Sequence, residues 1–175
     1  MKKIFLIPAT LFLIFLVQSC SAPKHTVTAP VAPRIIEKER IINKSFESIW
    51  QSTIELLATY NMPIKNLDKA SGFISTEYKQ ITGVPSQYAS CTGASSTFMG
   101  KVELTNHGGN LNVMLKRISD DSTKVTVNCF YSCMKNKYKY ANILSTTYVL
   151  ESTERIDCET TGLLERAILD YVSSK

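Results

Sequence analysis

Apolar residues recur at spacings of three and four over residues 45–61, and this periodicity predicts an amphipathic helix. Ser45 is a favourable N-cap residue, and Pro63 lies just beyond the expected end of the helix. A single apolar face is made by Phe46, Ile49, Trp50, Ile54 and Leu57. We therefore expect this face, which carries the only tryptophan of the chain, to pack into a hydrophobic core.

A second amphipathic helix is predicted over residues 161–172, near the end of the chain. Thr160 or Thr161 is available to cap its first turn. Its wide apolar stripe consists of Leu163, Leu164, Ala167, Ile168, Tyr171 and Val172. This helix is also expected to cover a hydrophobic surface.

Between the helices, apolar and polar residues alternate, which predicts β-strands. Residues 64–78 are typical of a hairpin, and Gly72 can supply the positive φ that its turn at 68–72 requires. Further strands are expected near Ile41 and over residues 97–104, 111–116, 125–131 and 146–151, with turns at 105–109 and 119–123 and a loop over 79–96. The pattern predicts an α+β fold, an antiparallel β-sheet packed against two amphipathic helices.

The N-terminus has the pattern of a bacterial export signal. Lys2 and Lys3 precede an apolar stretch of 14 residues at 4–17, which is shorter than the roughly 20 residues of a membrane span. The following residues, Val17 to Cys20, resemble a bacterial lipobox. That resemblance implies lipidation of Cys20 and, because Ser21 follows, an outer-membrane location with the domain facing the periplasm. We predict a signal peptide at 1–19, a lipidated cysteine and flexible Pro-containing tether at 20–40, and one globular domain at 41–175.

Composition and charge narrow the function classes. Removing residues 1–19 from the 175-residue chain leaves 156 residues, enough for one domain. The same removal takes away two lysines and lowers the net charge from +5 to +3, which is too mild to indicate nucleic-acid binding. With two histidines in the whole chain, no His-rich metal site and no cofactor is predicted.

A set of motifs resembles small bacterial lipoproteins with a helix-grip domain, such as the BamC-like accessory lipoproteins of outer-membrane assembly. The matching positions are Phe46, Trp50, Leu57, Pro63, Ile64, Asp68, Lys69, Gly72, Ile74, Thr76, Glu77, Thr161, Gly162, Leu164 and Glu165. The resemblance extends over about residues 42–175 and implies an envelope role without catalytic residues.

Four cysteines besides Cys20 indicate two disulfides, with three connectivities open. Cys129 and Cys133 lie about 13 Å apart if they share a regular strand, so they pair only across a bulge or turn. The resemblance implies a Cys91–Cys158 bridge, joining the 79–96 loop to the start of the last helix. The spacing of Cys129 and Cys133 also permits zinc, but the oxidising compartment argues against a metal site.

Catalytic chemistry has only weak candidates. His107 falls in the predicted turn at 105–109, where a solvated histidine is expected, and Asp120 and Asp121 fall in a Ser-Asp-Asp-Ser turn. A hydrolase would need His107 and one of these carboxylates in the same pocket. We therefore predict that the protein is not an enzyme.

The segment 131–140 has an unusual alternation of charge and aromatic rings. On a strand, Lys135, Lys137 and Lys139 share one face, while Tyr138 and Tyr140 share the other. One interpretation is a strip that recognises anionic lipid headgroups, cell-wall material or an acidic protein. The favoured interpretation is an edge strand that lysine protects from aggregation.

Together, these observations favour a non-enzymatic, membrane-anchored periplasmic lipoprotein that binds or scaffolds an envelope protein or a cell-wall component. The alternative is a carrier that holds a small apolar ligand between helix and sheet.

Overall fold

The computed structural model describes residues 35–142 and 146–175. The chain divides into two units at Arg34, and everything below concerns the second, Ile35–Lys175. The predicted signal peptide, Cys20 and the tether up to residue 34 lie outside the described residues. Strand β1 (Glu39–Ile42) begins two residues before the predicted start of the domain.

The domain is α+β, as predicted. Its helices are α1 (Phe46–Thr59) and α2 (Leu163–Ser174), and a 3-10 turn, η2, spans Pro85–Gln87. Besides β1, the strands are β2 (Ile64–Asp68), β3 (Phe73–Thr76), β4 (Lys79–Gln80), β5 (Ala89–Ser90), β6 (Ser95–Thr97), β7 (Gly100–Ser119), β8 (Ser122–Tyr140) and β9 (Tyr148–Thr160).

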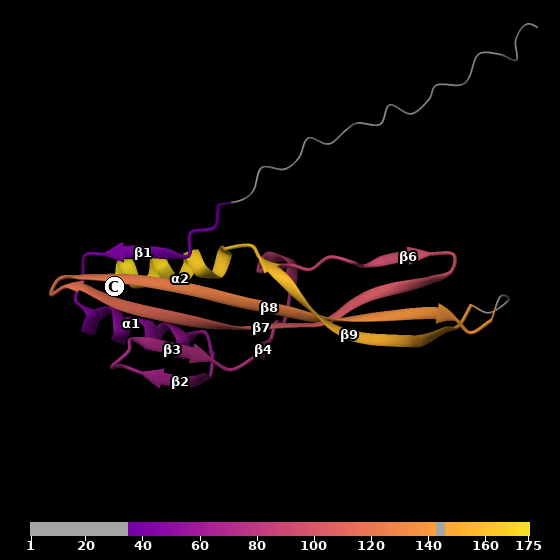
Figure 1. Cartoon of the computed structure of the whole chain (residues 1–175), viewed down its shortest axis with the longest axis horizontal. Helices are drawn as coiled ribbons and strands as arrows, with labels where there is room; N and C mark the ends of the chain where they lie inside the picture. The colour runs from indigo at the N-terminus through magenta and orange to yellow at the C-terminus, as the bar shows by residue number, and fades with distance from the viewer. Residues whose placement is uncertain (1–34, 143–145) are drawn as a thin grey trace, which may run out of the picture. The chain divides into compact units, whose positions relative to one another are not determined.

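The sheet is antiparallel, in the order β2-β3-β7-β8-β9-β5, with β1 paired to β8 and with β4 and β6 paired to β7. Figure 1 shows both helices beside the half of β7 and β8 that ends in their connecting turn. The other half continues with β6 and β9 beyond the helices. We call this extension, residues 95–106, 133–140 and 148–156, the distal arm.

The core lies between the helices and the half of the sheet that ends in the β7–β8 turn, which we call the near half. Alternate residues of β7 and β8, such as Val113 and Val127, are fully buried, as are Ile49 of α1 and Ile168 of α2. Trp50 is 4% exposed and belongs to this core, as its place on the apolar helix face predicts. Ser45 caps α1 through its side chain, which accepts a hydrogen bond from the Ser48 amide.

The predicted turn at 105–109 is wrong, because β7 runs unbroken through it. The register with β8 shifts between Thr105 and Gly108, which makes this segment a β-bulge. A Cβ at Gly108 would lie 2.4 Å from the Tyr78 hydroxyl, and one at Gly109 would lie 2.6 Å from the Tyr131 ring. The two glycines therefore mark close packing of aromatic rings on the strand rather than a reversal of the chain.

The edge-strand interpretation of residues 131–140 is also wrong. Strand β8 lies between β7 and β9 over this whole segment. Strand β9 extends to Thr160, well past the predicted end at residue 151, and supplies the missing partner. The N-cap of α2 is Gly162 rather than a threonine, although Thr160 accepts a hydrogen bond from the Gly162 amide.

Candidate functional site

A cavity of about 440 Å³ opens where the first turns of α2 face the bulged part of the sheet. Its walls come from the end of α1, the segment after β3, Tyr88 and α2, and β7 and β8 form its floor. The apolar side chains that line it include Met62, Ile81, Leu111, Tyr131, Leu164 and Ala167. The cavity lies within the size range of small-molecule sites.

One wall is tied to the end of α1 and to the bulge. The Lys79 ammonium donates to the backbone carbonyls of Asn61 at 2.8 Å and Tyr60 at 3.4 Å. A cation at a helix C-terminus satisfies carbonyls that have no partner within the helix. The Ile81 amide donates to the His107 carbonyl at 2.8 Å. The segment beside the cavity is therefore held by backbone groups at both ends.

The opposite wall, around Tyr88, is tied to the start of α2. The Tyr88 carbonyl accepts from the Thr161 amide at 2.9 Å, and the Thr161 hydroxyl donates to the Gln87 carbonyl at 2.6 Å. Three residues after Tyr88, a disulfide joins Cys91 to Cys158 with a Cα–Cα distance of 4.5 Å. These contacts fix this wall to α2 and to β9.

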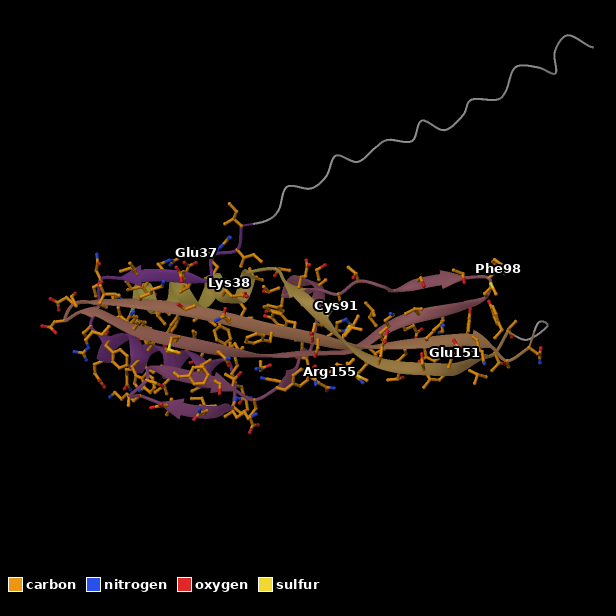
Figure 2. The ribbon with its side chains drawn as sticks, viewed as in Figure 1. Glu37, Lys38, Cys91, Phe98, Glu151 and Arg155 are labelled. Carbon is orange, nitrogen blue, oxygen red and sulfur yellow. A yellow bond between two sulfur atoms is a disulfide. The ribbon has the colours of Figure 1, made fainter. Side chains whose placement is uncertain are left out.

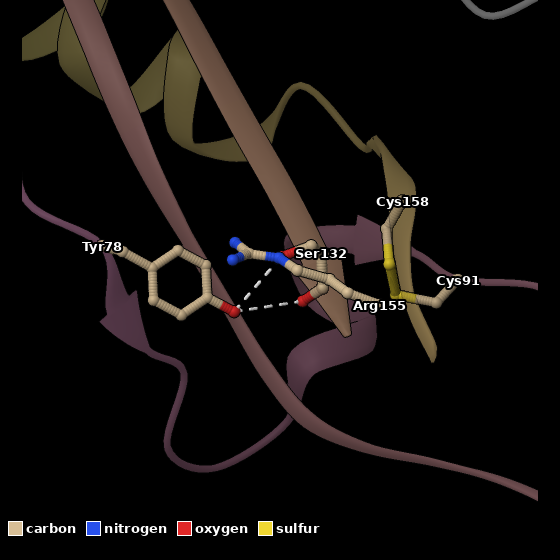
Figure 3. The surroundings of a disulfide bond; sticks show 5 residues. All are labelled: Tyr78, Cys91, Ser132, Arg155 and Cys158. Atoms are coloured by element: carbon tan, nitrogen blue, oxygen red, sulfur yellow. Dashed lines mark hydrogen bonds between the residues drawn. A yellow bond between two sulfur atoms is a disulfide. The ribbon is translucent and has the colours of Figure 1, made fainter. Parts of the chain in front are cut away.

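Figure 3 shows a polar brace beside the disulfide. The Arg155 guanidinium donates to the Ser132 hydroxyl at 2.9 Å and lies 4.5 Å from the centroid of the Tyr78 ring. The Ser132 hydroxyl in turn donates to the Tyr78 hydroxyl at 3.3 Å. This brace connects the chain leaving β3 to β8 and β9 at the bulge.

Two buried polar atoms lack a hydrogen-bond partner among the described residues, one on Tyr131 of the cavity floor and one on Glu165, next to the cavity residue Leu164. The Tyr131 hydroxyl is buried and has no hydrogen-bond partner among the described residues. Glu165 of α2 is fully buried; its Oε2 accepts from the Thr160 hydroxyl at 3.0 Å, whereas its Oε1 has no partner in the described part of the chain. Native structures leave few buried polar atoms unpaired, and each one calls for an explanation.

Burial governs the protonation of the groups around this floor. It raises the pKa of the Tyr131 phenol, and the neighbouring Cys129 thiol adds to that effect. It likewise raises the pKa of Cys129, with Glu165 adding to the shift. Both groups are therefore neutral at physiological pH.

The structure joins two of the four cysteines that the sequence singled out. Cys91 is bonded to Cys158, the pairing that the family resemblance implies. The second predicted disulfide is absent within the described residues, where Cys129 and Cys133 are buried free thiols. They lie four residues apart on continuous β8, and that spacing along an extended strand keeps them from bonding.

The residues of the predicted hydrolase site do not meet. His107 lies in the bulge of β7, and Asp120 follows the far end of the same strand. Thirteen residues of extended chain separate them, roughly 40 Å. This separation contradicts the hypothesis of a pocket shared by His107 with Asp120 or Asp121.

The predicted interaction strip on β8 is occupied by contacts within the distal arm. Lys135 pairs with Glu154 at 2.8 Å, while Lys137 and Lys139 lie 3.2 and 3.8 Å from Glu151. The two tyrosines of the strip are also engaged. The Tyr138 ring faces the Lys101 ammonium, and Tyr140 stacks on Tyr148 with ring centroids 4.7 Å apart.

Sequence reasoning missed two residues, Tyr131 on the cavity floor and Glu165, which is fully buried next to the lining residue Leu164. A signal for Glu165 was present, because it shares the apolar stripe of its helix with Ile168, Leu169 and Val172, all of which are buried. A carboxylate on such a stripe indicates a buried polar group. Tyr131 carried no comparable signal, since a tyrosine on an alternating strand is an ordinary core residue.

A scan against protein-family models and a search of curated proteins found no match. No helix within residues 35–142 and 146–175 is long and apolar enough to cross a membrane.

Proposed function

We propose that this protein is a non-enzymatic carrier or sensor that holds a small, mostly apolar molecule with one polar group in the α2 cavity. The observation that carries the proposal is a mostly apolar cavity of about 440 Å³ that a few polar side chains, among them Gln80 and Asn110, also line. Tyr131 belongs to its floor, and the buried hydroxyl of this residue has no partner among the described residues. Such a combination, apolar walls with a few converging polar groups, is typical of ligand sites.

The ligand-free protein carries the cost of an unpaired buried hydroxyl at Tyr131. A buried hydroxyl without a hydrogen bond costs on the order of 1–3 kcal/mol. Because this hydroxyl is closed to solvent, a ligand removes that cost when a small shift of the Tyr131 ring brings the hydroxyl to the polar atom of the ligand. The apolar body of the ligand then covers Leu111, Leu164 and Ala167. Binding is therefore favoured by both parts of an amphipathic molecule.

The predicted lipid anchor fits this activity. Lipidation of Cys20 would place the domain beside a membrane, where apolar molecules partition. This location is proposed from the sequence of residues 1–20. A domain tethered in this way takes its ligand from the lipid phase or delivers it there.

Filling the cavity tests the proposal. Ala167 lines the cavity from α2, so Ala167→Trp is expected to occupy its space. Ala58 is exposed on α1 outside the cavity, so Ala58→Trp is the matched control. The probe is N-phenyl-1-naphthylamine, an aromatic amine that fluoresces in apolar surroundings, added to full-length protein refolded from denaturant to remove bound molecules. We expect Ala167→Trp to weaken probe binding at least roughly tenfold, and Ala58→Trp to change it less than about twofold.

Two results would contradict the proposal. One is the absence of a saturable increase in probe fluorescence with the wild-type protein, and the other is equal binding of the probe by the two tryptophan variants. Circular dichroism of both variants verifies that each has folded.

Removing the Tyr131 hydroxyl provides a second prediction with opposite signs for stability and binding. Tyr131→Phe is expected to stabilise the ligand-free domain by about 1 kcal/mol, because an unpartnered buried hydroxyl is lost. The same change is expected to weaken binding of the probe amine by roughly tenfold, because its N–H loses an acceptor. Urea unfolding and fluorescence titration measure the two effects, and a loss of stability would show that the hydroxyl is bonded in the native protein.

A second candidate function is docking to an envelope protein through the distal arm. The turn between β6 and β7 exposes Phe98 by 88% and Met99 by 71%, and Figure 2 shows Phe98 at the end of the arm. Large apolar side chains at an exposed tip favour a protein contact. The two candidates differ in what accompanies the native protein, a small molecule in the cavity or a whole polypeptide on the arm.

A further inference from the structure

A third sulfur lies beside the disulfide. The Sγ atoms of Cys91, Cys133 and Cys158 all lie within 4.8 Å of one another. Two of them form the disulfide, and Cys133 is a free thiol that is 1% exposed. The group combines a disulfide with a third cysteine in reach of both its sulfurs, and nothing in the proposed ligand site uses it.

We propose that these three cysteines form a thiol–disulfide exchange site, in which the bond moves from Cys91–Cys158 to Cys133–Cys158 and releases the Cys91 thiol. This inference is independent of the proposed ligand. It concerns the chemistry of the sulfurs at the root of the distal arm.

The sheet order identifies Cys158 as the sulfur that both bonds share. Strand β9, which carries Cys158, lies between β8 and β5. On one side, Cys158 is paired in register with Tyr131 and Cys133 with Ile156, so both cysteines point to the same face of adjacent strands. On the other side, the pairing of Ala89 with Thr160 and Ser90 with Glu159 continues to Cys91 and Cys158.

The exchange balances without an oxidant or a reductant. Cys133 loses its proton to solvent, and the thiolate attacks Sγ of Cys158. A new Cys133–Cys158 bond forms while the Cys91–Cys158 bond breaks. The electron pair of the broken bond goes to Sγ of Cys91, which takes up a proton, so the protein keeps one disulfide and the same number of thiols.

The two disulfides, Cys91–Cys158 before the exchange and Cys133–Cys158 after it, constrain different parts of the chain. A Cys133–Cys158 bond links strands that are already hydrogen-bonded neighbours, so it adds little constraint. Release of Cys91 frees the connection between β5 and β6, where Gly93 has a φ of +109° and where even an added Cβ would only make ordinary contact with the Lys135 side chain, at 3.7 Å. The exchange therefore exposes a nucleophilic thiol without reducing the protein, and it loosens the chain that leads from Tyr88 of the cavity wall.

Cys129 serves as an internal control, because it is a second buried free thiol on β8. It lies on the same face of β8 but is placed four residues away, beside Tyr131 and Glu165. Its sulfur is not part of the three-sulfur group. Both buried thiols thus lie on one face of the same strand, but only the Cys133 sulfur lies close to the disulfide.

Trapping the released thiol tests the proposal. Full-length, non-reduced protein is incubated at pH 8 with N-ethylmaleimide. Peptide mapping then assigns the labels and disulfides to individual cysteines, so that a label on Cys20 is distinguished from one on Cys91. We expect a label on Cys91 together with a Cys133–Cys158 disulfide. Cys133→Ser is expected to slow labelling of Cys91 at least roughly tenfold, whereas Cys129→Ser leaves it unchanged. Two results would overturn the proposal. One is labelling of Cys91 in the Cys133→Ser variant as fast as in the wild type, and the other is a wild-type protein that still contains the Cys91–Cys158 bond when its labelling is complete.

A second variant tests whether the alternative bond forms at all. Cys91→Ser, refolded with oxidised glutathione as the oxidant, is expected to contain a Cys133–Cys158 disulfide. Three unlinked thiols at Cys129, Cys133 and Cys158 would overturn the proposal. The wild-type labelling experiment remains decisive if this variant does not fold.

Discussion

Gly72→Ala is expected to destabilise the domain by at least about 3 kcal/mol, from strain and a backbone clash together. Gly72 has a φ of +74°, where a Cβ costs on the order of 1–2 kcal/mol. A Cβ would also lie 2.1 Å from the Leu115 carbonyl oxygen, a backbone atom that cannot rotate away. Because the Gly72 carbonyl accepts from the Leu115 amide at 2.8 Å, any shift also breaks the contact between the β2–β3 turn and β7.

Substitution of Gly83 separates the cost of backbone strain from the cost of the clash with Leu115. Its φ is +96°, but a Cβ there meets nothing within 4 Å. Gly83→Ala is therefore expected to cost only the strain, about 1–2 kcal/mol. Urea unfolding of the two variants measures the difference, and equal losses would show that the clash with Leu115 contributes nothing.

Reduction of the Cys91–Cys158 disulfide is expected to lower the free energy of unfolding by about 4 kcal/mol. The bond joins cysteines 67 residues apart, and a cross-link that closes so long a loop strongly restricts the unfolded chain. It also holds the Tyr88 wall of the cavity to β9, so reduction is expected to loosen that wall as well.

Urea unfolding with and without a phosphine reductant measures this effect, and pH 6 is the suitable condition. Burial raises the pKa of Cys133 above its ordinary value, so Cys133 is protonated there and exchange is suppressed. The double variant with Cys91→Ser and Cys158→Ser is the control and should not respond to reductant. A change of less than about 1 kcal/mol in the wild type would contradict the account of this bond.

Local patterns made the near half of the domain predictable. The helix faces around Trp50 and Ile168 follow from spacing alone, and the hairpin turn at Gly72 follows from the need for a positive φ. The turn at Asp120 and Asp121 was equally clear, because both residues favour turns and separate two alternating segments.

The distal arm was not predictable for a physical reason. Gly108 and Gly109 have the composition of a turn, yet their role is to admit the rings of Tyr78, from the connection between β3 and β4, and Tyr131, from β8. Likewise, whether the lysines of β8 lie at an edge depends on β9, which pairs with them from the next part of the chain. Neither fact is encoded in a local window of sequence.

The candidate site was predictable only in outline. A ligand space between helix and sheet was the sequence-based alternative, but Tyr131 and Glu165 become notable only when their burial and missing partners are known. In the same way, Cys133 is one of four equivalent cysteines in the sequence. Its distinct position arises because β9 brings Cys158 alongside it and β5 brings Cys91 to the other side of β9.

The central claim is that the α2 cavity holds a small molecule in the native protein. Native mass spectrometry of the full-length protein, extracted from membranes in mild detergent, tests this claim most directly. We predict a non-covalent small-molecule adduct that gentle collisional activation removes, and that is absent from Ala167→Trp but retained by Ala58→Trp. A wild-type spectrum without any such adduct, or an adduct equally abundant in both variants, would contradict the claim, and a bound polypeptide in its place would favour docking through the distal arm.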